Sequence, residues 1–249
     1  MKGLVFIDIK LQKYVSDCGI MSRRAAEKEI ILGHFEINGA KASIGDRLNP
    51  GKDTVRYKGK VIKPSGKKVY ICLNKPVGYV TTMSDERGRA AVSELTADAG
   101  TRVYPAGRLD MDSEGLVICT NDGEFANLLM HPVGGIKKVY IVTVRGKIDN
   151  QALDKLRAMR KLDDESIAPV GVELLERNEN ESILKIVLTE GRNRQIRRMC
   201  VHIGLTVLRL KRVSIGGVAL GGLESGKWRS LTPQELASLN KKHRIGGRR

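Results

Sequence analysis

The sequence predicts an α+β protein built from a small N-terminal module and a larger domain. Helix-like and strand-like patterns of apolar residues are both present, and their irregular order argues against a doubly wound parallel sheet. A basic segment at 61–68, with Pro64 and Gly66, is typical of a linker and divides the chain. With 249 residues, of which 41% are hydrophobic, the chain can bury a sizeable core.

The first part is expected to be a module over residues 1–60. Apolar residues at helical spacing predict one helix over 11–18. Ser22 is placed to cap a second helix over 23–32, and Gly33 follows as the residue that stops it. Short strands are predicted on either side of the turn Asn38-Gly39 and over 53–57.

The larger domain is expected over residues 69–240, followed by a basic tail at 241–249. Short apolar or alternating runs predict strands at 69–73, 80–82, 115–120, 138–144, 183–189 and 207–213. Helical spacing predicts helices at 123–130, 150–159 and 194–203. A capping box that begins at Thr232 and includes Glu235 opens a last helix.

The charge balance favours a polyanionic partner. Lys and Arg number 44 against 28 Asp and Glu, which leaves a net charge of +16. The stretch 191–212 has seven basic residues and no acidic one. A nucleic acid fits this balance, whereas binding to a membrane surface would call for a long amphipathic helix that is not found. No apolar run is long enough to span a bilayer, and we expect a cytoplasmic protein.

The cysteines do not predict a metal site. The four stand at positions 18, 72, 119 and 200, and no two have the close spacing of zinc ligands. Cys72 and Cys119 lie inside apolar runs and are expected to be buried thiols.

Two polar runs carry the candidate chemistry. Gly107-Arg108-Leu109-Asp110 places a carboxylate just before the predicted strand at 115–120, and 190–199 supplies a dense cationic cluster. A carboxylate kept ionised by arginines can do covalent or acid–base chemistry on a nucleic acid. The plain alternative is that Asp110 only caps the turn before the strand.

Four motifs in order resemble those of the pseudouridine synthases. They are Asn74-Lys75-Pro76-Val77-Gly78, Gly107-Arg108-Leu109-Asp110, Lys138-Val139-Tyr140 and the run from Gly191 to Met199. The N-terminal module, with Ser-Arg-Arg before its second helix, resembles the alpha-L RNA-binding module of a ribosomal protein. Together they are similar to the ribosomal group of these enzymes. The resemblance implies a mixed, mostly antiparallel sheet with flanking helices.

The resemblance also implies a reaction and its catalytic residues. One RNA uridine is isomerised: the uracil N1–C1′ bond breaks, the base turns, and C5 joins C1′, so no cofactor is needed. Asp110 matches the catalytic aspartate. Three roles are compatible with this match: attack on the base, attack on the sugar, or abstraction of a proton from the sugar. Arg197 matches an arginine that pairs with this aspartate. Tyr140 matches the active-site tyrosine, although its alternation with Val142 and Val144 would also suit an ordinary core position.

The implied partner is ribosomal RNA or an assembling ribosomal subunit, with no membrane involved, and the protein is expected to be a monomer. A uridine inside folded RNA must be flipped out of its stack before it can react. Phosphate contacts are expected from Arg23, Arg24, Arg108, Arg192, Arg194 and Arg198. Lys75 and Pro76 are expected to support the catalytic loop, and the cluster from Arg192 to Arg212 to grip the RNA backbone.

Two other functions and one choice of substrate are weighed against this expectation. A non-catalytic RNA-binding factor for ribosome assembly could have the same fold. Such a protein would not need Asp110, Tyr140 and Arg197, and all three are present in this sequence. A sugar hydrolase would need two carboxylates that flank a glycosidic bond. The segment from Asp85 to Val92 resembles an insert of the large-subunit enzymes, with Ala90-Ala91 in place of Pro-Thr, and favours 23S over 16S rRNA.

Overall fold

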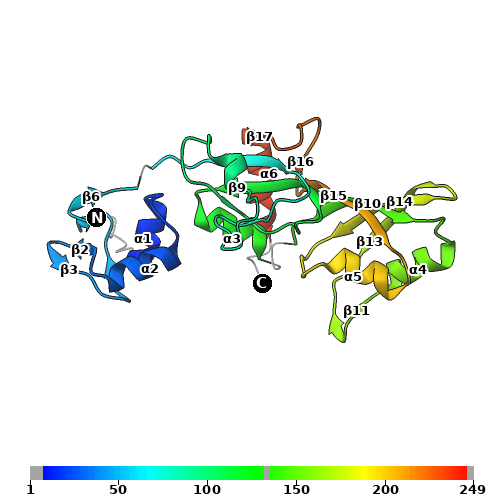
Figure 1. Ribbon diagram of the computed structural model, residues 1–249, viewed down its shortest axis with the longest axis horizontal. Coiled ribbons are helices and arrows are strands. Elements are labelled where there is room, and N and C mark those ends of the chain that lie inside the picture. Colours follow the sequence, from blue (N-terminus) through cyan, green and yellow to red (C-terminus); the bar gives the residue numbers. More distant parts are fainter. Residues whose placement is uncertain (1–7, 65, 132–134, 246–249) are drawn as a thin grey trace. The chain divides into compact units, whose positions relative to one another are not determined.

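The structure is a computed structural model that describes residues 8–64, 66–131 and 135–245. The chain divides into two compact units (Figure 1). The N-terminal unit contains the residues up to Val69 with two short segments, Ala99–Val103 and Asn121–Gly123. All other residues form the C-terminal unit.

The N-terminal unit has two helices and a four-stranded antiparallel sheet in the order β3-β2-β5-β6. Both predicted helices are confirmed. Ser22 caps the second helix by accepting a hydrogen bond from the Ala25 amide at 3.2 Å, and Gly33 follows with φ +75°. The elements are β1 (Ile9–Lys10), α1 (Leu11–Asp17), α2 (Arg23–Ile31), β2 (Phe35–Ile37), β3 (Ala40–Lys41), β4 (Arg47–Leu48), β5 (Val55–Tyr57) and β6 (Lys60–Ile62).

The expected end of this module at residue 60 is too early. Strand β6 continues to Ile62, which pairs with Val55 and is buried in the core of the unit. Ile62 is apolar, and its burial keeps the end of the strand in the sheet although the segment around it is basic. The linker therefore starts after Ile62.

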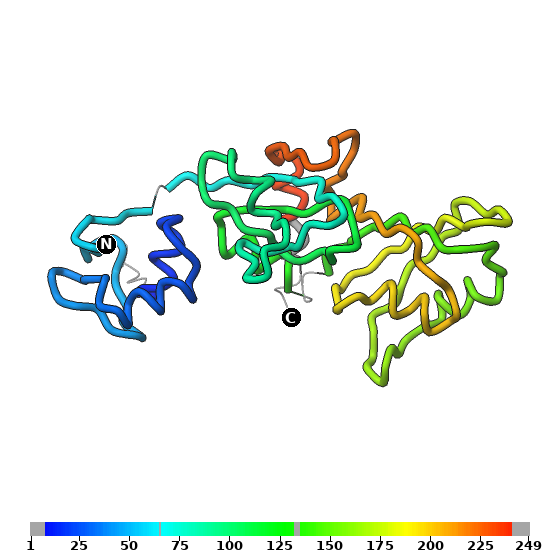
Figure 2. Tube along the Cα trace, in the orientation of Figure 1, coloured from blue at the N-terminus to red at the C-terminus, as the bar shows by residue number. Residues whose placement is uncertain are grey.

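The C-terminal unit is built on a nine-stranded sheet whose main path is β13-β14-β10-β15-β9-β7-β17 (Figures 1 and 2). All pairings are antiparallel except that of β15 with β9. The mixed, mostly antiparallel sheet is thus confirmed. Its strands are β7 (Tyr70–Lys75), β8 (Tyr104–Pro105), β9 (Glu114–Thr120), β10 (Lys138–Arg145), β13 (Gly171–Arg177), β14 (Glu181–Leu188), β15 (Val207–Ile215), β16 (Val218–Ala219) and β17 (Trp228–Ser230).

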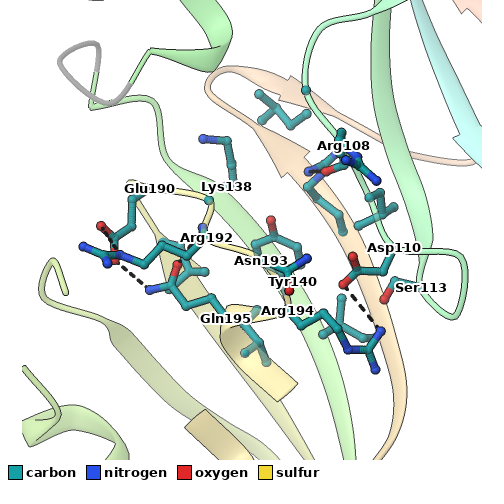
Figure 3. A pocket seen from close by; sticks show the side chains of 18 of the residues that line it. Arg108, Asp110, Ser113, Lys138, Tyr140, Glu190, Arg192, Asn193, Arg194 and Gln195 are labelled. Carbon is teal, nitrogen blue, oxygen red and sulfur yellow. Dashed lines mark hydrogen bonds and ion pairs between the residues drawn. The ribbon is translucent and has the colours of Figure 1, made fainter. Parts of the chain in front are cut away.

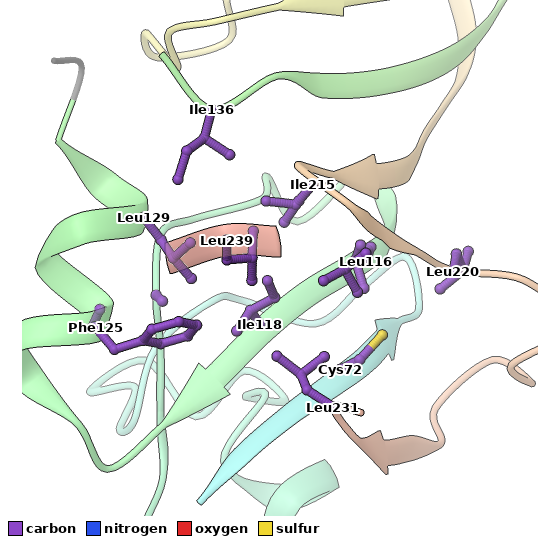
Figure 4. Packing of buried hydrophobic residues seen from close by; sticks show 13 residues of the cluster. Cys72, Leu116, Ile118, Phe125, Leu129, Ile136, Ile215, Leu220, Leu231 and Leu239 are labelled. Atoms are coloured by element: carbon purple, nitrogen blue, oxygen red, sulfur yellow. The ribbon is translucent and has the colours of Figure 1, made fainter. Parts of the chain in front are cut away.

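Helices flank this sheet, and their packing follows the apolar spacing of the sequence. Phe125 and Leu129 of α3 pack with Leu239 of α6 around Leu116 and Ile118 of β9 (Figure 4). Farther along the sheet, α4 contacts β13. The remaining elements are α3 (Gly123–Met130), α4 (Asn150–Ala158), the hairpin β11 (Lys161–Leu162) and β12 (Glu165–Ser166), α5 (Gln195–His202), α6 (Pro233–Ile245) and a 3-10 turn (Glu94–Thr96). None of the described helices is long and apolar enough to cross a membrane.

Two expectations for this unit are wrong. Residues 80–82 form no strand, because Val80 makes only an isolated bridge to Ala91 and the Thr81 hydroxyl bonds to the backbone of Leu109. The basic tail expected from residue 241 does not begin there, because helix α6 continues to Ile245. The rest of the expected tail, 246–249, lies outside the described residues. The predicted capping box is confirmed, with the Glu235 amide donating to Thr232 Oγ1 at 3.2 Å.

The parallel contact between β15 and β9 joins the two halves of the sheet. Arg212 pairs with Gly115, so the loop before β9 ends at this junction. A Cβ atom at residue 115 would lie 2.3 Å from the Arg212 carbonyl oxygen, and φ there is +106°. Only glycine allows this approach.

Candidate active site

A pocket of about 580 Å³ opens beside this junction (Figure 3). Its walls come from the loop before β9, from β10 and β15, and from the N-terminal end of α5. Six residues predicted from the sequence line it: Arg108, Asp110, Tyr140, Arg192, Arg194 and Arg197. Arg198 does not line this pocket, and Arg23 and Arg24 belong to the N-terminal unit.

Asp110 is held in the pocket by the backbone of its own loop. The Leu109 amide donates to Thr81 Oγ1 at 3.1 Å, and the Thr81 hydroxyl donates back to the Leu109 carbonyl at 2.5 Å. The Ser113 amide donates to the Asp110 carbonyl at 3.1 Å and closes the turn. The Asp110 side chain remains 34% exposed, so a substrate can reach its carboxylate.

The expected pairing of Arg197 with Asp110 is wrong in this structure. Arg197 donates to the Asp112 carbonyl at 2.7 Å, and its Nε lies 3.3 Å from the Asp112 carboxylate. Arg194 is the arginine near Asp110, at 3.9 Å (Figure 3). The reason is the start of helix α5: Arg194 occupies its N-cap in the left-handed region, with φ +47°, and so faces the loop.

Asp112 is the carboxylate that both arginines contact. Arg194 donates to it at 2.7 Å. Burial alone would raise the pKa of Asp112, but the hydrogen bond from Arg194 and the charges of Arg197 and Arg194 outweigh burial and lower it. The hydrogen bond to Asp112 in turn raises the pKa of Arg194. This pair is therefore ionised at neutral pH.

Tyr140 forms part of the pocket wall from strand β10. Its side chain is only 7% exposed, and Val142 and Val144 are buried after it, as the alternation predicts. The Arg212 guanidinium lies 6.0 Å from its ring centroid, within range of a cation–π contact. Among the described residues the hydroxyl has no hydrogen-bond partner, so it can serve a ligand.

Two buried cations, Arg212 and Lys75, support the site through hydrogen bonds to backbone carbonyls. Arg212 is 4% exposed and donates to the carbonyls of Leu116 at 2.7 Å and Arg108 at 3.3 Å. Its expected role in gripping the RNA backbone is therefore wrong. The period-2 alternation with Leu210 could have shown that Arg212 faces inward.

Lys75 is fully buried beneath the loop. Its Nζ donates to the carbonyls of Pro76 and Tyr79, both at 2.8 Å. Burial lowers the pKa of Lys75 to about 8, and the carboxylates of Asp110 and Asp112 partly oppose that shift.

The remaining predicted arginines differ in whether they are ion-paired with a carboxylate. Arg192 is ion-paired with Glu165 and Glu190. Arg198 lies 2.5 Å from Asp163. Within the described residues the exposed Arg23 and Arg24 at the start of α2 have no ion pair. Arg108 is exposed at the pocket edge.

Comparisons with known proteins agree with this arrangement. The family model for RNA pseudouridylate synthase matches residues 69–202. An uncharacterized RNA pseudouridine synthase of Aquifex aeolicus is 40% identical over 94% of this chain and 95% of its own length. The ribosomal large subunit pseudouridine synthase B of Bacillus subtilis is 38% identical over 92% of this chain and 95% of its own.

Two further proteins extend the comparison. A dual-specificity RNA pseudouridine synthase of Escherichia coli K12 is 38% identical over 94% of this chain and 79% of its own length. A crystal structure of a pseudouridylate synthase superposes with a TM-score of 0.67 at 28% identity and covers 93% of this chain and 99% of that one. This chain therefore belongs to the RNA pseudouridylate synthase family and, as a member, is an RNA pseudouridine synthase enzyme.

Proposed function

We propose that this protein isomerises a specific uridine of ribosomal RNA to pseudouridine, with Asp110 as its catalytic carboxylate. The observation that carries the proposal is the position of Asp110, which is accessible in a pocket that Tyr140 and several arginines also line. The name of the Bacillus subtilis relative refers to the large ribosomal subunit. We propose 23S rRNA of the large subunit, rather than 16S rRNA, as the substrate. We also propose that the protein acts in the cytoplasm.

The chemistry needs a carboxylate and no external reactant. The N1–C1′ bond of the uridine breaks, the base turns within the pocket, C5 bonds to C1′, the C5 proton leaves, and N1 takes up a proton. Asp110 serves this reaction as a nucleophile toward sugar or base, or as a base toward the sugar. Lys75 and Arg194 place positive charge near this carboxylate.

The other wall residues have roles in binding the flipped nucleoside. A pocket of about 580 Å³ is large enough for one nucleoside, and the ring of Tyr140 offers a surface for the base. The hydroxyl of Tyr140, which has no hydrogen-bond partner among the described residues, can relay the proton released at C5. Arg108, exposed at the edge, is placed to meet a backbone phosphate of the extruded nucleotide.

The test is tritium release from RNA labelled at uridine C5, because forming the C5–C1′ bond expels that hydrogen. Transcripts of 16S and 23S rRNA are compared, each with the wild-type protein, Asp110→Asn and the control Asp154→Asn. Asp154 also pairs with an arginine, Arg157, but lies on α4 outside the pocket. We expect release from the 23S transcript, its loss in Asp110→Asn and no change in Asp154→Asn.

Other outcomes would contradict specific parts of this proposal. Release from the 16S transcript alone would overturn the choice of subunit. Turnover by Asp110→Asn would remove Asp110 from the chemistry. If both transcripts and isolated subunits bind tightly and release nothing, a non-catalytic role in ribosome assembly becomes the better interpretation.

A further inference from the structure

We propose that Thr81 is a positioning residue whose hydroxyl fixes the backbone next to Asp110 and so sets where the Asp110 carboxylate lies in the pocket. This inference rests on the proposed role of Asp110. Thr81 lies outside the four motifs of the sequence and does not line the pocket, so it acts through its neighbour Leu109. It is buried, at 9% exposed, in the segment that follows strand β7.

A single hydroxyl satisfies both backbone groups of Leu109. The Thr81 hydroxyl donates to the Leu109 carbonyl at 2.5 Å, and its Oγ1 accepts from the Leu109 amide at 3.1 Å. Leu109 is itself buried, at 7% exposed, so without the hydroxyl both of its backbone groups would lack a partner away from water. Two bonds to one atom fix the direction in which the backbone enters Asp110.

The backbone on the other side of Asp110 is fixed from the same segment. The Gly78 amide donates to the Met111 carbonyl at 2.8 Å. Both neighbours of Asp110 are therefore bonded to residues 78–81, while the Asp110 side chain stays 34% exposed. A reacting group that is held in place before the substrate arrives needs no reorganisation when it reacts.

The position of Thr81 is in turn fixed by the residue before it. The Val80 amide donates to the Ala90 carbonyl at 2.9 Å, and the Val80 carbonyl accepts from the Val92 amide at 3.0 Å. Ala91 and Val92 are buried. The end of the segment from Asp85 to Val92 thus anchors Val80, and through it the hydroxyl that holds the catalytic loop.

The substitution that isolates the hydroxyl is Thr81→Val, which keeps the shape of the side chain and removes both bonds to Leu109. We expect the single-turnover rate at saturating enzyme to fall by about 10-fold or more, since a displacement of ~1 Å can cost up to ~10²-fold. RNA affinity should be unchanged, because Thr81 lies outside the pocket. Thr81→Ser keeps the hydroxyl and should restore most of the rate.

Ser182 on β14 offers a matched control. Its hydroxyl makes the same pair of bonds, because it accepts from the Ile148 amide at 3.0 Å and donates to the Gly146 carbonyl at 2.9 Å. Ser182 is fully buried and does not line the pocket. Ser182→Ala should therefore lower thermal stability, as Thr81→Val does, but leave the single-turnover rate unchanged.

Two measurements read out the effect. Tritium release from the C5-labelled 23S transcript gives the single-turnover rate, with wild type and Asp110→Asn alongside. Hydrogen–deuterium exchange of the peptide that spans residues 107–115 reports the Leu109 amide without any need for activity. We expect faster exchange there in Thr81→Val, and wild-type exchange in Thr81→Ser and Ser182→Ala. If Thr81→Val does not fold, Thr81→Cys replaces it, because a thiol is only a weak donor and acceptor.

The results that would overturn the inference are distinct from those that overturn the proposed function. A rate in Thr81→Val no lower than in Ser182→Ala, or an equal loss in Thr81→Ser, removes the positioning role of the hydroxyl. A fall in RNA affinity with an unchanged rate would make Thr81 part of RNA binding instead. Turnover by Asp110→Asn, or no release by the wild type from any rRNA substrate, would reject the proposed function, whereas the exchange of the Leu109 amide would still test the contact with Thr81.

Discussion

Gly115 lies where β9 and β15 run parallel, and its missing side chain lets the two backbones meet. The site depends on this contact, because the loop with Asp110 precedes β9 and the buried Arg212 lies on β15. The motif around Asp110 is readable in the sequence, but the approach of residue 212 is not, since the paired residues 115 and 212 lie nearly one hundred positions apart.

Gly115→Ala should be strongly destabilising. The new Cβ would lie 2.3 Å from the Arg212 carbonyl oxygen at a backbone φ of +106°. The strand pairing would therefore be disrupted and the backbone strained. We expect a loss of roughly 3 kcal/mol or more in the free energy of unfolding. Urea denaturation measures it, with Gly222→Ala as control, because no atom lies within 4 Å of a Cβ there. Equal midpoints for the two variants would contradict the close approach.

Among the elements, those with strong local signals agree with the sequence. Helix α2 has a capping serine and a terminal glycine, and α6 has a capping box, so local hydrogen bonds define their starts or ends. The sequence does not predict strand β13, because its residues are largely polar and only partly buried at one edge of the sheet. The antiparallel pairing with β14 holds this segment in an extended conformation that its own residues do not predict.

The β11–β12 hairpin has an acidic tip that occupies two arginines expected to bind RNA. Asp163 and Asp164 have φ of +49° and +63°, as a tight two-residue turn requires. Asp163 pairs with Arg198, and Glu165 pairs with Arg192. A phosphate that approaches these guanidinium groups must compete with the hairpin carboxylates.

The double variant Asp163→Asn/Glu165→Gln should therefore bind RNA more tightly. Because both carboxylates are largely exposed, these ion pairs are weak, and we expect a gain in affinity of roughly fivefold. Fluorescence anisotropy with a labelled rRNA fragment measures this, and Asp154→Asn again serves as control. Weaker binding would mean that the carboxylates orient the arginines for RNA instead of competing with it.

Over the whole molecule, the basic residues that give the net charge of +16 differ in whether they are already paired with acidic side chains. In the C-terminal unit Arg192, Arg194, Arg197 and Arg198 all have acidic partners. In the N-terminal unit Arg23 and Arg24 are exposed at a helix start, where backbone amides also favour an anion, and within the described residues neither is ion-paired. We propose that this unit is the RNA-binding module.

Arg23→Gln/Arg24→Gln in the full chain should weaken RNA binding and its dependence on salt together. Each lost phosphate contact lowers the slope of log K against log salt by about 0.7 to 0.9, so two contacts lower it by roughly 1.5. Titrations of rRNA over a range of KCl concentrations give the slope. Arg157→Gln, which removes an arginine already paired with Asp154, is the control and should leave the slope unchanged. An unaltered slope in the double variant would argue against the module as an RNA contact.

The sequence by itself indicated the α+β class, the described helices, the long central strands of the sheet, the family resemblance and six of the residues that line the pocket. These depend on local patterns: capping residues, apolar periodicity and motifs whose members lie close together along the chain. Tertiary structure alone decided which charges meet. The order of Arg194 and Arg197 on α5 does not reveal that Asp112 binds both while Asp110 remains accessible, because that depends on the angle at which α5 meets a loop some eighty residues away. Ion pairing is decided by distances of a few ångströms, and only the packed sheet sets those distances.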